Sequence, residues 1–172
     1  MDLFFRFAED SPFKRDTSIH YDGIKWFAPN TDFYYQSKLY RYRTPETVSV
    51  YGTKGEKRQQ VKYGYFLLNT VGSICTLNVY KNVVTPSDQG DVDSNYIATW
   101  FTDETTGKET YDVGRYVDVG DERPDSNAMY TINLNNAYNP YCAYSSGYSC
   151  AIPRKEDHLS FPVLAGEKKY HE

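Results

Sequence analysis

An aspartate and an arginine carry the clearest chemical potential in this sequence. Asp103 begins an Asp-x-Thr-x-Gly segment, and Arg115 follows Gly114 at the start of an expected strand. A desolvated or charge-coupled carboxylate can act as a general base or a nucleophile. The same Asp-x-Thr pattern is also typical of a turn in which the carboxylate accepts backbone N–H groups. Asp103 is therefore either a candidate catalytic residue or a structural turn residue.

Arg115 also has two interpretations. Burying an unpaired guanidinium is very costly, so this side chain must reach solvent or meet a carboxylate. The candidate partners within the chain are Asp103, Asp118 and Glu167. Alternatively, the planar fork of Arg115 binds the carboxylate or phosphate of a ligand at two points.

A long segment without periodicity, 133–153, is rich in Tyr and Asn. Ordered loops of more than about 15 residues are uncommon and often functional. Asn135, Tyr138 and Asn139 either fix this loop by hydrogen bonds to the backbone or form the polar wall of a ligand pocket. With Glu167 from a later segment, they are our candidates for binding a small polar or anionic ligand.

The three cysteines leave several alternatives open. Cys75 lies on an apolar strand face and is typical of a small core residue. Seven residues separate Cys142 from Cys150, whereas a zinc knuckle has about two to four. Another seven residues separate Cys150 from His158. Two structural thiols, a disulfide between Cys142 and Cys150, and a metal site formed by Cys142, Cys150 and His158 are the alternatives, and we do not favour the metal.

Composition and missing motifs exclude several classes of function. The net charge of −4 argues against a general nucleic-acid binder, which usually carries a basic face. No run of about 18 apolar residues exists, so we expect no membrane span. No Gly-rich phosphate loop, zincin helix or nucleophile-elbow serine is present, and we expect no cofactor. Residues 1–10 lack a secretory signal, so we expect a soluble protein in the cytoplasm or inside an organelle.

Alternation of apolar and polar residues predicts strands along most of the chain. The expected strands lie at 33–42, 46–51, 61–69, 74–80, 96–101, 128–134 and 159–164. Turns that contain Gly or Asn separate several of them. The 172 residues are expected to form a single domain over 1–172, with the motif-bearing half at 102–168. The predicted fold is mainly β: an antiparallel β-sandwich or partly open β-barrel of about eight strands, with a short N-terminal helix.

The helix expected within 1–9 contains Phe4, Phe5 and Phe7. Isolated helices shorter than about 12 residues are marginal in water, so these rings need a surface to pack on. We expect the helix to cover the open end of the sheet and to bury Phe4 and Phe7. Any protein partner is expected on the Tyr-rich loop 138–148, because interfaces favour Tyr.

Four blocks of the C-terminal half resemble domain-of-unknown-function family 1684, whose members are uncharacterised bacterial and archaeal proteins. The residues that match its pattern are Asp103, Thr105, Gly107, Thr110, Tyr111, Gly114, Arg115 and Tyr116; Asn135, Ala137, Tyr138, Asn139, Pro140, Cys142, Ala143 and Tyr144; Cys150 and Pro153; and Ala165, Gly166, Glu167 and Lys168. Two positions depart from the pattern: Asn133 stands in place of an acid and Ala151 in place of a Pro. The resemblance covers roughly 102–168 and implies no established activity.

Two classes of function follow. The favoured one is a non-catalytic β-rich module, either an accessory subunit of a larger protein assembly or a binder of a small polar or anionic ligand. The alternative is a hydrolase-type enzyme that uses Asp103, with Arg115 and the Asn-rich loop holding an anionic substrate. In either case we expect the polar residues of the motif blocks to approach one region: Asp103, Arg115, Asn135, Asn139 and Glu167.

Overall fold

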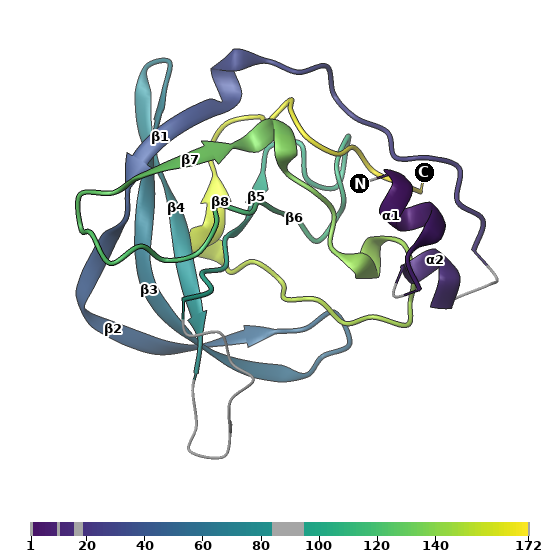
Figure 1. The fold of residues 1–172 in the computed structure, drawn as a ribbon, viewed down its shortest axis with the longest axis horizontal. Helices are drawn as coiled ribbons and strands as arrows, with labels where there is room; N and C mark the ends of the chain where they lie inside the picture. Colours follow the sequence, from purple (N-terminus) through teal and green to yellow (C-terminus); the bar gives the residue numbers. More distant parts are fainter. Residues whose placement is uncertain (1, 10, 16–18, 84–94, 172) are drawn as a thin grey trace.

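The computed structural model describes residues 2–9, 11–15, 19–83 and 95–171 (Figure 1). In these residues the chain is mainly β, with antiparallel sheets, no closed barrel and a short N-terminal helix, which confirms the predicted fold class. The helices are α1 (Asp2–Phe7) and α2 (Pro12–Arg15), with short 3₁₀ helices η1 (Thr31–Phe33), η2 (Leu134–Asn136), η3 (Tyr141–Ala143) and η4 (Lys155–Asp157). The strands are β1 (Tyr34–Lys38), β2 (Tyr40–Tyr51), β3 (Lys57–Thr70), β4 (Ser73–Asn82), β5 (Trp100–Asp103), β6 (Arg115–Tyr116), β7 (Met129–Asn133) and β8 (His158–Leu159).

The largest sheet is the antiparallel meander β2–β3–β4, whose long, bent strands curve around the rest of the molecule (Figure 1). Gly55 and Gly72 supply the positive φ values of its two turns. The register of β3 shifts against both of its neighbours near Gly64. A Cβ at this position would lie 2.4 Å from the carbonyl oxygen of Tyr40. Glycine therefore allows β2 and β3 to approach closely where the sheet bends.

Two smaller sheets complete the fold. β1 pairs antiparallel with β7, and β5 lies between an antiparallel β6 and a parallel β8. The main core lies between the sheets and includes Phe66, Leu77, Phe101 and Ile132, which are all almost completely buried. Two expected strands, 96–101 and 159–164, are shorter than the alternation suggested: 96–99 contains only an isolated bridge at Ala98, and 160–164 is not part of a strand.

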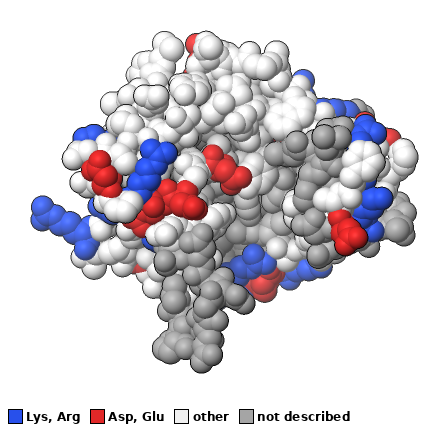
Figure 2. Space-filling model, in the orientation of Figure 1, with Lys and Arg blue, Asp and Glu red and all other residues white. Residues whose placement is uncertain are grey.

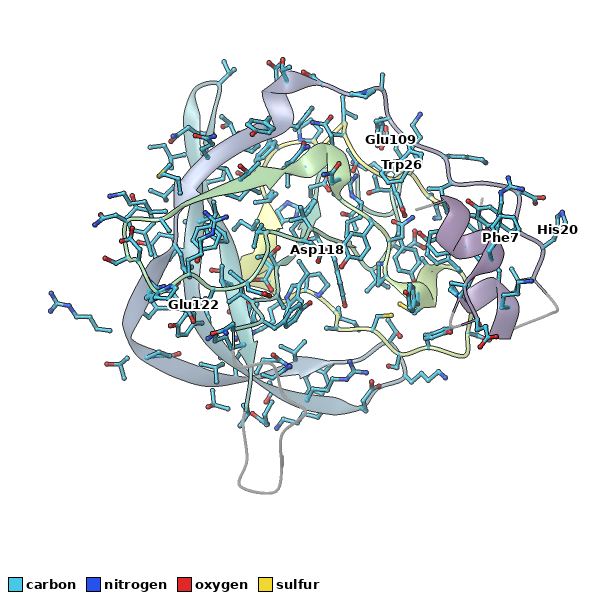
Figure 3. The ribbon with its side chains drawn as sticks, in the orientation of Figure 1. Phe7, His20, Trp26, Glu109, Asp118 and Glu122 are labelled. Carbon is cyan, nitrogen blue, oxygen red and sulfur yellow. The ribbon has the colours of Figure 1, made fainter. Side chains whose placement is uncertain are left out.

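The N-terminal helix packs by Phe5, and Phe7, which we expected to be buried, is exposed. Phe5 is buried, with its ring 5.5 Å from that of Phe13 and 5.0 Å from that of Tyr144. Phe7 is 70% exposed (Figure 3), so its predicted burial was wrong. The side chain of Phe4 lies outside the described residues. α1 thus packs on the Tyr-rich loop and α2, and not on the open end of the sheet.

Charged side chains of the described residues are dispersed over the face that Figure 2 shows. On the face in Figure 2, residues of both signs lie close together at several places and a broad upper area carries little charge. One cluster fastens a loop to the large sheet, because Glu122 (Figure 3) accepts from Arg41, Tyr63 and Lys81. No helix within the described residues is long and apolar enough to cross a membrane.

Candidate functional site

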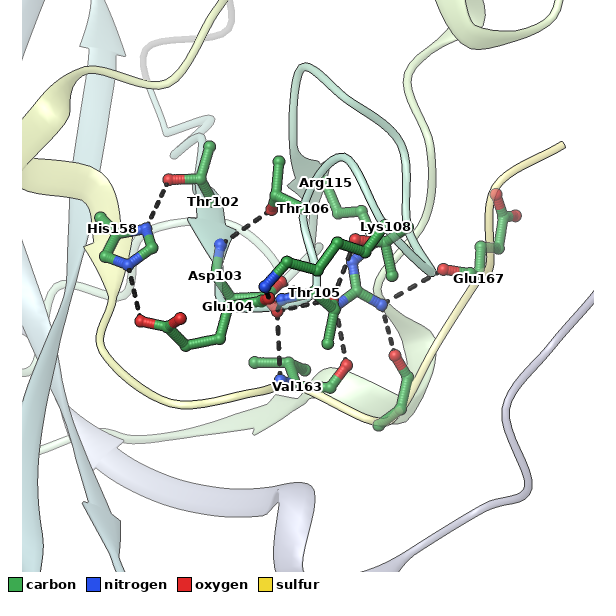
Figure 4. A network of polar contacts seen from close by, with 12 residues as sticks. Thr102, Asp103, Glu104, Thr105, Thr106, Lys108, Arg115, His158, Val163 and Glu167 are labelled. Carbon is green, nitrogen blue, oxygen red and sulfur yellow. Dashed lines mark hydrogen bonds and ion pairs between the residues drawn. The ribbon is translucent and has the colours of Figure 1, made fainter. Parts of the chain in front are cut away.

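Asp103 and Arg115 form a buried ion pair between the adjacent strands β5 and β6. Nη2 of Arg115 lies 3.0 Å from Oδ2 of Asp103, and the two side chains are 0% and 1% exposed. The guanidinium also donates to the carbonyl oxygens of Val163, Ala165 and Glu167 (Figure 4). Arg115 thereby holds the C-terminal segment 163–167 against β6.

The second oxygen of Asp103 closes the turn that the sequence indicated. Oδ1 accepts from the backbone N–H of Thr105 at 2.8 Å, from the hydroxyl of Thr105 at 2.6 Å and from the backbone N–H of Val163 at 3.2 Å. Gly114, before Arg115, has a φ of +113°, and a Cβ there would lie 2.5 Å from the carbonyl oxygen of Phe101. The glycine allows the chain to enter β6 so closely that Arg115 reaches Asp103.

Glu167 continues this network toward the Tyr-rich loop. Its Oε2 accepts from the backbone N–H of Asn139 at 2.8 Å and from the hydroxyl of Tyr144. The amide of Asn139 donates to the carbonyl oxygen of Lys168 at 2.9 Å. Burial raises the pKa of Glu167, although the hydrogen bonds from Tyr144 and Asn139 and the charge of Arg115 oppose this shift.

The structure brings four of the five expected residues together. Asp103, Arg115, Asn139 and Glu167 share one buried network, and each exposes at most 3% of its surface. Asn135 lies apart from them and holds Asn30, accepting from its backbone N–H at 2.8 Å and donating to its carbonyl oxygen at 2.9 Å.

Asn133, one of the departures from the family pattern, caps the helix η2. Its side-chain oxygen accepts from the backbone N–H of Asn135 at 3.2 Å and from the side-chain amide of Asn135 at 2.9 Å. A carboxylate at this position would accept the same bonds. The replacement of an acid by Asn133 therefore preserves a structural function.

A cavity of about 410 Å³ lies beside the buried network of Asp103, Arg115, Asn139 and Glu167. We call this cavity the aromatic pocket. One wall comes from the sheet β2–β3–β4, and the other comes from β5, β6 and the loop 138–151. The described residues that line it are Val50, Arg58, Gln60, Asn82, Tyr96, Ala98, Trp100, Tyr116, Tyr138, Pro140, Tyr141, Tyr148, Ser149, Cys150 and Ala151. Tyr138 is thus the one candidate ligand residue from the sequence that lines this pocket.

The buried network positions the wall of the pocket through the alternation of β6. Arg115 points into the network, and the next residue, Tyr116, lines the pocket. Tyr116 and Tyr138 exchange two backbone hydrogen bonds of 2.9 Å, and the hydroxyl of Tyr116 donates to the carbonyl oxygen of Ala151 at 2.7 Å. The motif residues therefore fix the loop whose tyrosines form the pocket.

Asp157, which no sequence motif indicated, holds the Trp100 side of the pocket. Oδ1 accepts from Asn78 at 2.7 Å and from the hydroxyl of Tyr80 at 2.8 Å, while Oδ2 accepts from the indole N–H of Trp100 at 3.2 Å. The rings of Tyr80 and Trp100 stack with centroids 4.6 Å apart. Burial raises the pKa of Asp157 despite these hydrogen bonds. In the sequence its neighbours in 154–158 are charged or polar, and no motif marks Asp157 as a buried residue.

Cys142 and Cys150 lie next to each other as free thiols. His158 is placed elsewhere, with Nδ1 3.1 Å from the hydroxyl of Thr102 and Nε2 3.4 Å from a carboxylate oxygen of Glu104. Within the described ranges, no three or more His, Cys, Asp or Glu side chains gather in a way that could hold a metal ion.

Comparison with known proteins identifies the family. A family profile with the description "Protein of unknown function (DUF1684)" matches residues 19–168. The chain belongs to this family. The resemblance seen in the motif blocks is thus confirmed and extends over the earlier strands.

An uncharacterized protein of Haloarcula marismortui, whose structure was solved by solution NMR, is similar to this DUF1684 chain. It is 27% identical with a TM-score of 0.69, and the match covers 97% of this chain and 87% of that one. Among proteins with curated descriptions, none matches. The family is of unknown function and the archaeal protein is uncharacterized, so neither similarity indicates an activity.

Proposed function

We propose that this DUF1684 protein is a non-catalytic module that binds a small anionic ligand with a flat apolar face in the aromatic pocket. The observation that carries the proposal is the composition of the pocket wall, in which tyrosines and Trp100 accompany a single charged side chain, Arg58, among the described lining residues. Ligand pockets are typically apolar and aromatic, with a few polar groups that orient the ligand.

Arg58 supplies the partner for an anionic group. Its Nη2 is occupied by Glu56 and by the carbonyl oxygen of Ser149, which orient the guanidinium. Nε and Nη1 make no hydrogen bond to other described residues, so they are available to a carboxylate or phosphate. The hydroxyl of Tyr148 is buried without a partner among the described residues and offers a further polar contact.

The state of Asp103 supports a non-catalytic role. The hydrolase alternative requires a carboxylate that a substrate can reach. Asp103 is 3% exposed, and its two oxygens accept from Arg115, Thr105 and Val163.

The orientation of the loop 138–148 also favours a small ligand over a protein partner, because three of its tyrosines line the pocket and Tyr144 packs against Phe5.

The test uses the fluorescence of Trp100, which becomes the single tryptophan when the exposed Trp26 is replaced by Phe. In this background we titrate phenylacetate and its neutral isostere phenylacetamide. We expect saturable binding of phenylacetate, and we expect the Arg58→Met variant to weaken it about 10- to 100-fold, since a hydrogen bond to a charged group contributes about 1.5–3 kcal/mol.

The matched control is Arg43→Met, which removes an exposed cation that does not line the pocket. This variant should bind phenylacetate like the parent protein. The proposal would be refuted if neither probe changed the fluorescence of Trp100 up to its solubility limit. It would also be refuted if the Arg58 and Arg43 variants lost the same affinity for phenylacetate.

A further inference from the structure

Cys142 and Cys150 are arranged as a pair and not as two independent thiols. The backbone N–H of Cys142 donates to Sγ of Cys150 over 3.2 Å, so the two residues are in direct contact. This contact gives the two cysteines the close approach that a disulfide bond requires.

The two thiols differ in their surroundings. Cys142 is partly exposed, and its Sγ accepts from the hydroxyl of Tyr111 over 3.7 Å. Cys150 is buried and lines the aromatic pocket. The hydrogen bonds from Cys150, Tyr111 and Thr53 lower the pKa of Cys142 to about 6, against the opposing effect of burial. The pKa of Cys150 is raised, first by its hydrogen bond to Cys142 and then by burial, while the nearby charge of Arg58 opposes this shift.

We propose that Cys142 and Cys150 are a reversible dithiol–disulfide couple, in which Cys142 is the attacking thiol and Cys150 is the resolving thiol. The nucleophile in thiol–disulfide exchange is the thiolate, and access decides which thiol reacts first. Both criteria select Cys142. This inference does not depend on the proposed ligand of the aromatic pocket.

The oxidant that fits this chemistry is a small disulfide such as oxidised glutathione. The Cys142 thiolate attacks one sulfur of that disulfide, its S–S bond breaks, and one glutathione leaves and takes up a proton. Cys150 then loses its proton and attacks the sulfur of Cys142, which releases the second glutathione. The net reaction oxidises two protein thiols to one disulfide and reduces oxidised glutathione to two molecules of glutathione.

The experiment uses the full chain with Cys75→Ser, so that Cys142 and Cys150 are the only thiols. The protein is equilibrated in buffers of reduced and oxidised glutathione, quenched with acid and alkylated. Its intact mass is then measured by mass spectrometry. We expect both thiols to disappear together, with a loss of two hydrogens in mass, and to return together as reduced glutathione increases. Peptide mapping without reductant should find 142 linked to 150.

Two variants assign the roles. In the same background, Cys150→Ser should accumulate a stable glutathione adduct on Cys142, whereas Cys142→Ser should leave the buried Cys150 unmodified. If a variant does not fold, peptide mapping of the parent protein without reductant still shows whether 142 is linked to 150. The proposal would be overturned by two alkylated thiols in fully oxidised buffer or by a disulfide between two chains. It would also be overturned by a glutathione adduct that forms faster on Cys150 than on Cys142.

Discussion

At the scale of single residues, two buried carboxylates of this protein perform similar structural tasks with different numbers of hydrogen bonds. Both oxygens of Asp157 accept from two donors each: Asn78 and Tyr80 on one, and Trp100 and the backbone N–H of Arg154 on the other. Glu167 uses only Oε2. Its Oε1 is buried and has no hydrogen-bond partner among the described residues.

This difference predicts responses of different size to amide substitution. In Glu167→Gln the carboxamide oxygen keeps both hydrogen bonds, but the amide nitrogen takes the buried position of Oε1, so we expect a small loss of about 1 kcal/mol in the free energy of unfolding. In Asp157→Asn the amide nitrogen faces two donors, and we expect a loss of about 1–3 kcal/mol. Urea unfolding at pH 7 measures the free energy of unfolding of both variants. Equal losses would contradict the different numbers of hydrogen bonds that the two carboxylates accept.

The same two carboxyls predict how stability depends on pH. Burial raises the pKa of each in the folded protein. The folded chain therefore retains protons that the unfolded chain has already released, and their contribution to stability is complete below the ordinary carboxyl range, at about pH 4. It is lost as the pH rises through the raised folded values. Urea unfolding from pH 4.5 to 8 should show this decline in the wild type and a weaker one in Glu167→Gln; identical slopes would exclude Glu167 as a source.

At the scale of elements, the short strand β6 connects the buried network to the pocket. Arg115 and Tyr116 are successive residues, so their side chains point to opposite faces of the strand. One pairs with Asp103 and the other lines the aromatic pocket. A family motif that sequence reasoning associated with ligand binding thus acts on the pocket indirectly, through the position of a strand.

Breaking the ion pair should therefore affect the whole C-terminal half. Arg115→Met leaves the carboxylate of Asp103 buried without its charge partner, and we expect a loss of about 3–5 kcal/mol in the free energy of unfolding. The exposed Arg43→Met should change it by less than about 0.5 kcal/mol. Chemical denaturation of both variants tests this, and similar effects of the two substitutions would show that the pair does not stabilise the fold.

At the scale of the whole molecule, the N-terminal helix and the C-terminal segment meet at Tyr144. The ring of Tyr144 contacts Phe5 of α1, and its hydroxyl donates to Glu167. The helix therefore packs against the loop whose other tyrosines form the pocket, and it is part of the support of this loop.

The two described phenylalanines of α1 provide a matched test of this support. Phe5→Ala removes a buried ring and should lower the free energy of unfolding by about 3–5 kcal/mol. Phe7→Ala removes a ring that is 70% exposed and should leave it nearly unchanged. Thermal unfolding followed by circular dichroism compares them, and a larger effect of Phe7→Ala would show that the helix packs by its other face.

The sequence by itself determined the local properties of this protein. Alternation of apolar residues and glycine turns indicated a mainly β fold with antiparallel sheets, and the spacing around Asp103, Arg115 and Glu167 identified the family. Both signals are local because each depends on residues a few positions apart or on a motif that is read in order.

Only the tertiary structure decided which side chains share a site. Asp157 reaches Trp100 across 57 positions, and Tyr116 and Tyr138 line the same pocket as residues of β3 and β4. Alternation predicts that neighbouring side chains in a strand face opposite ways, but it does not say which face becomes core and which becomes pocket. That choice depends on what packs against each face, and here the packing surfaces come from distant parts of the chain.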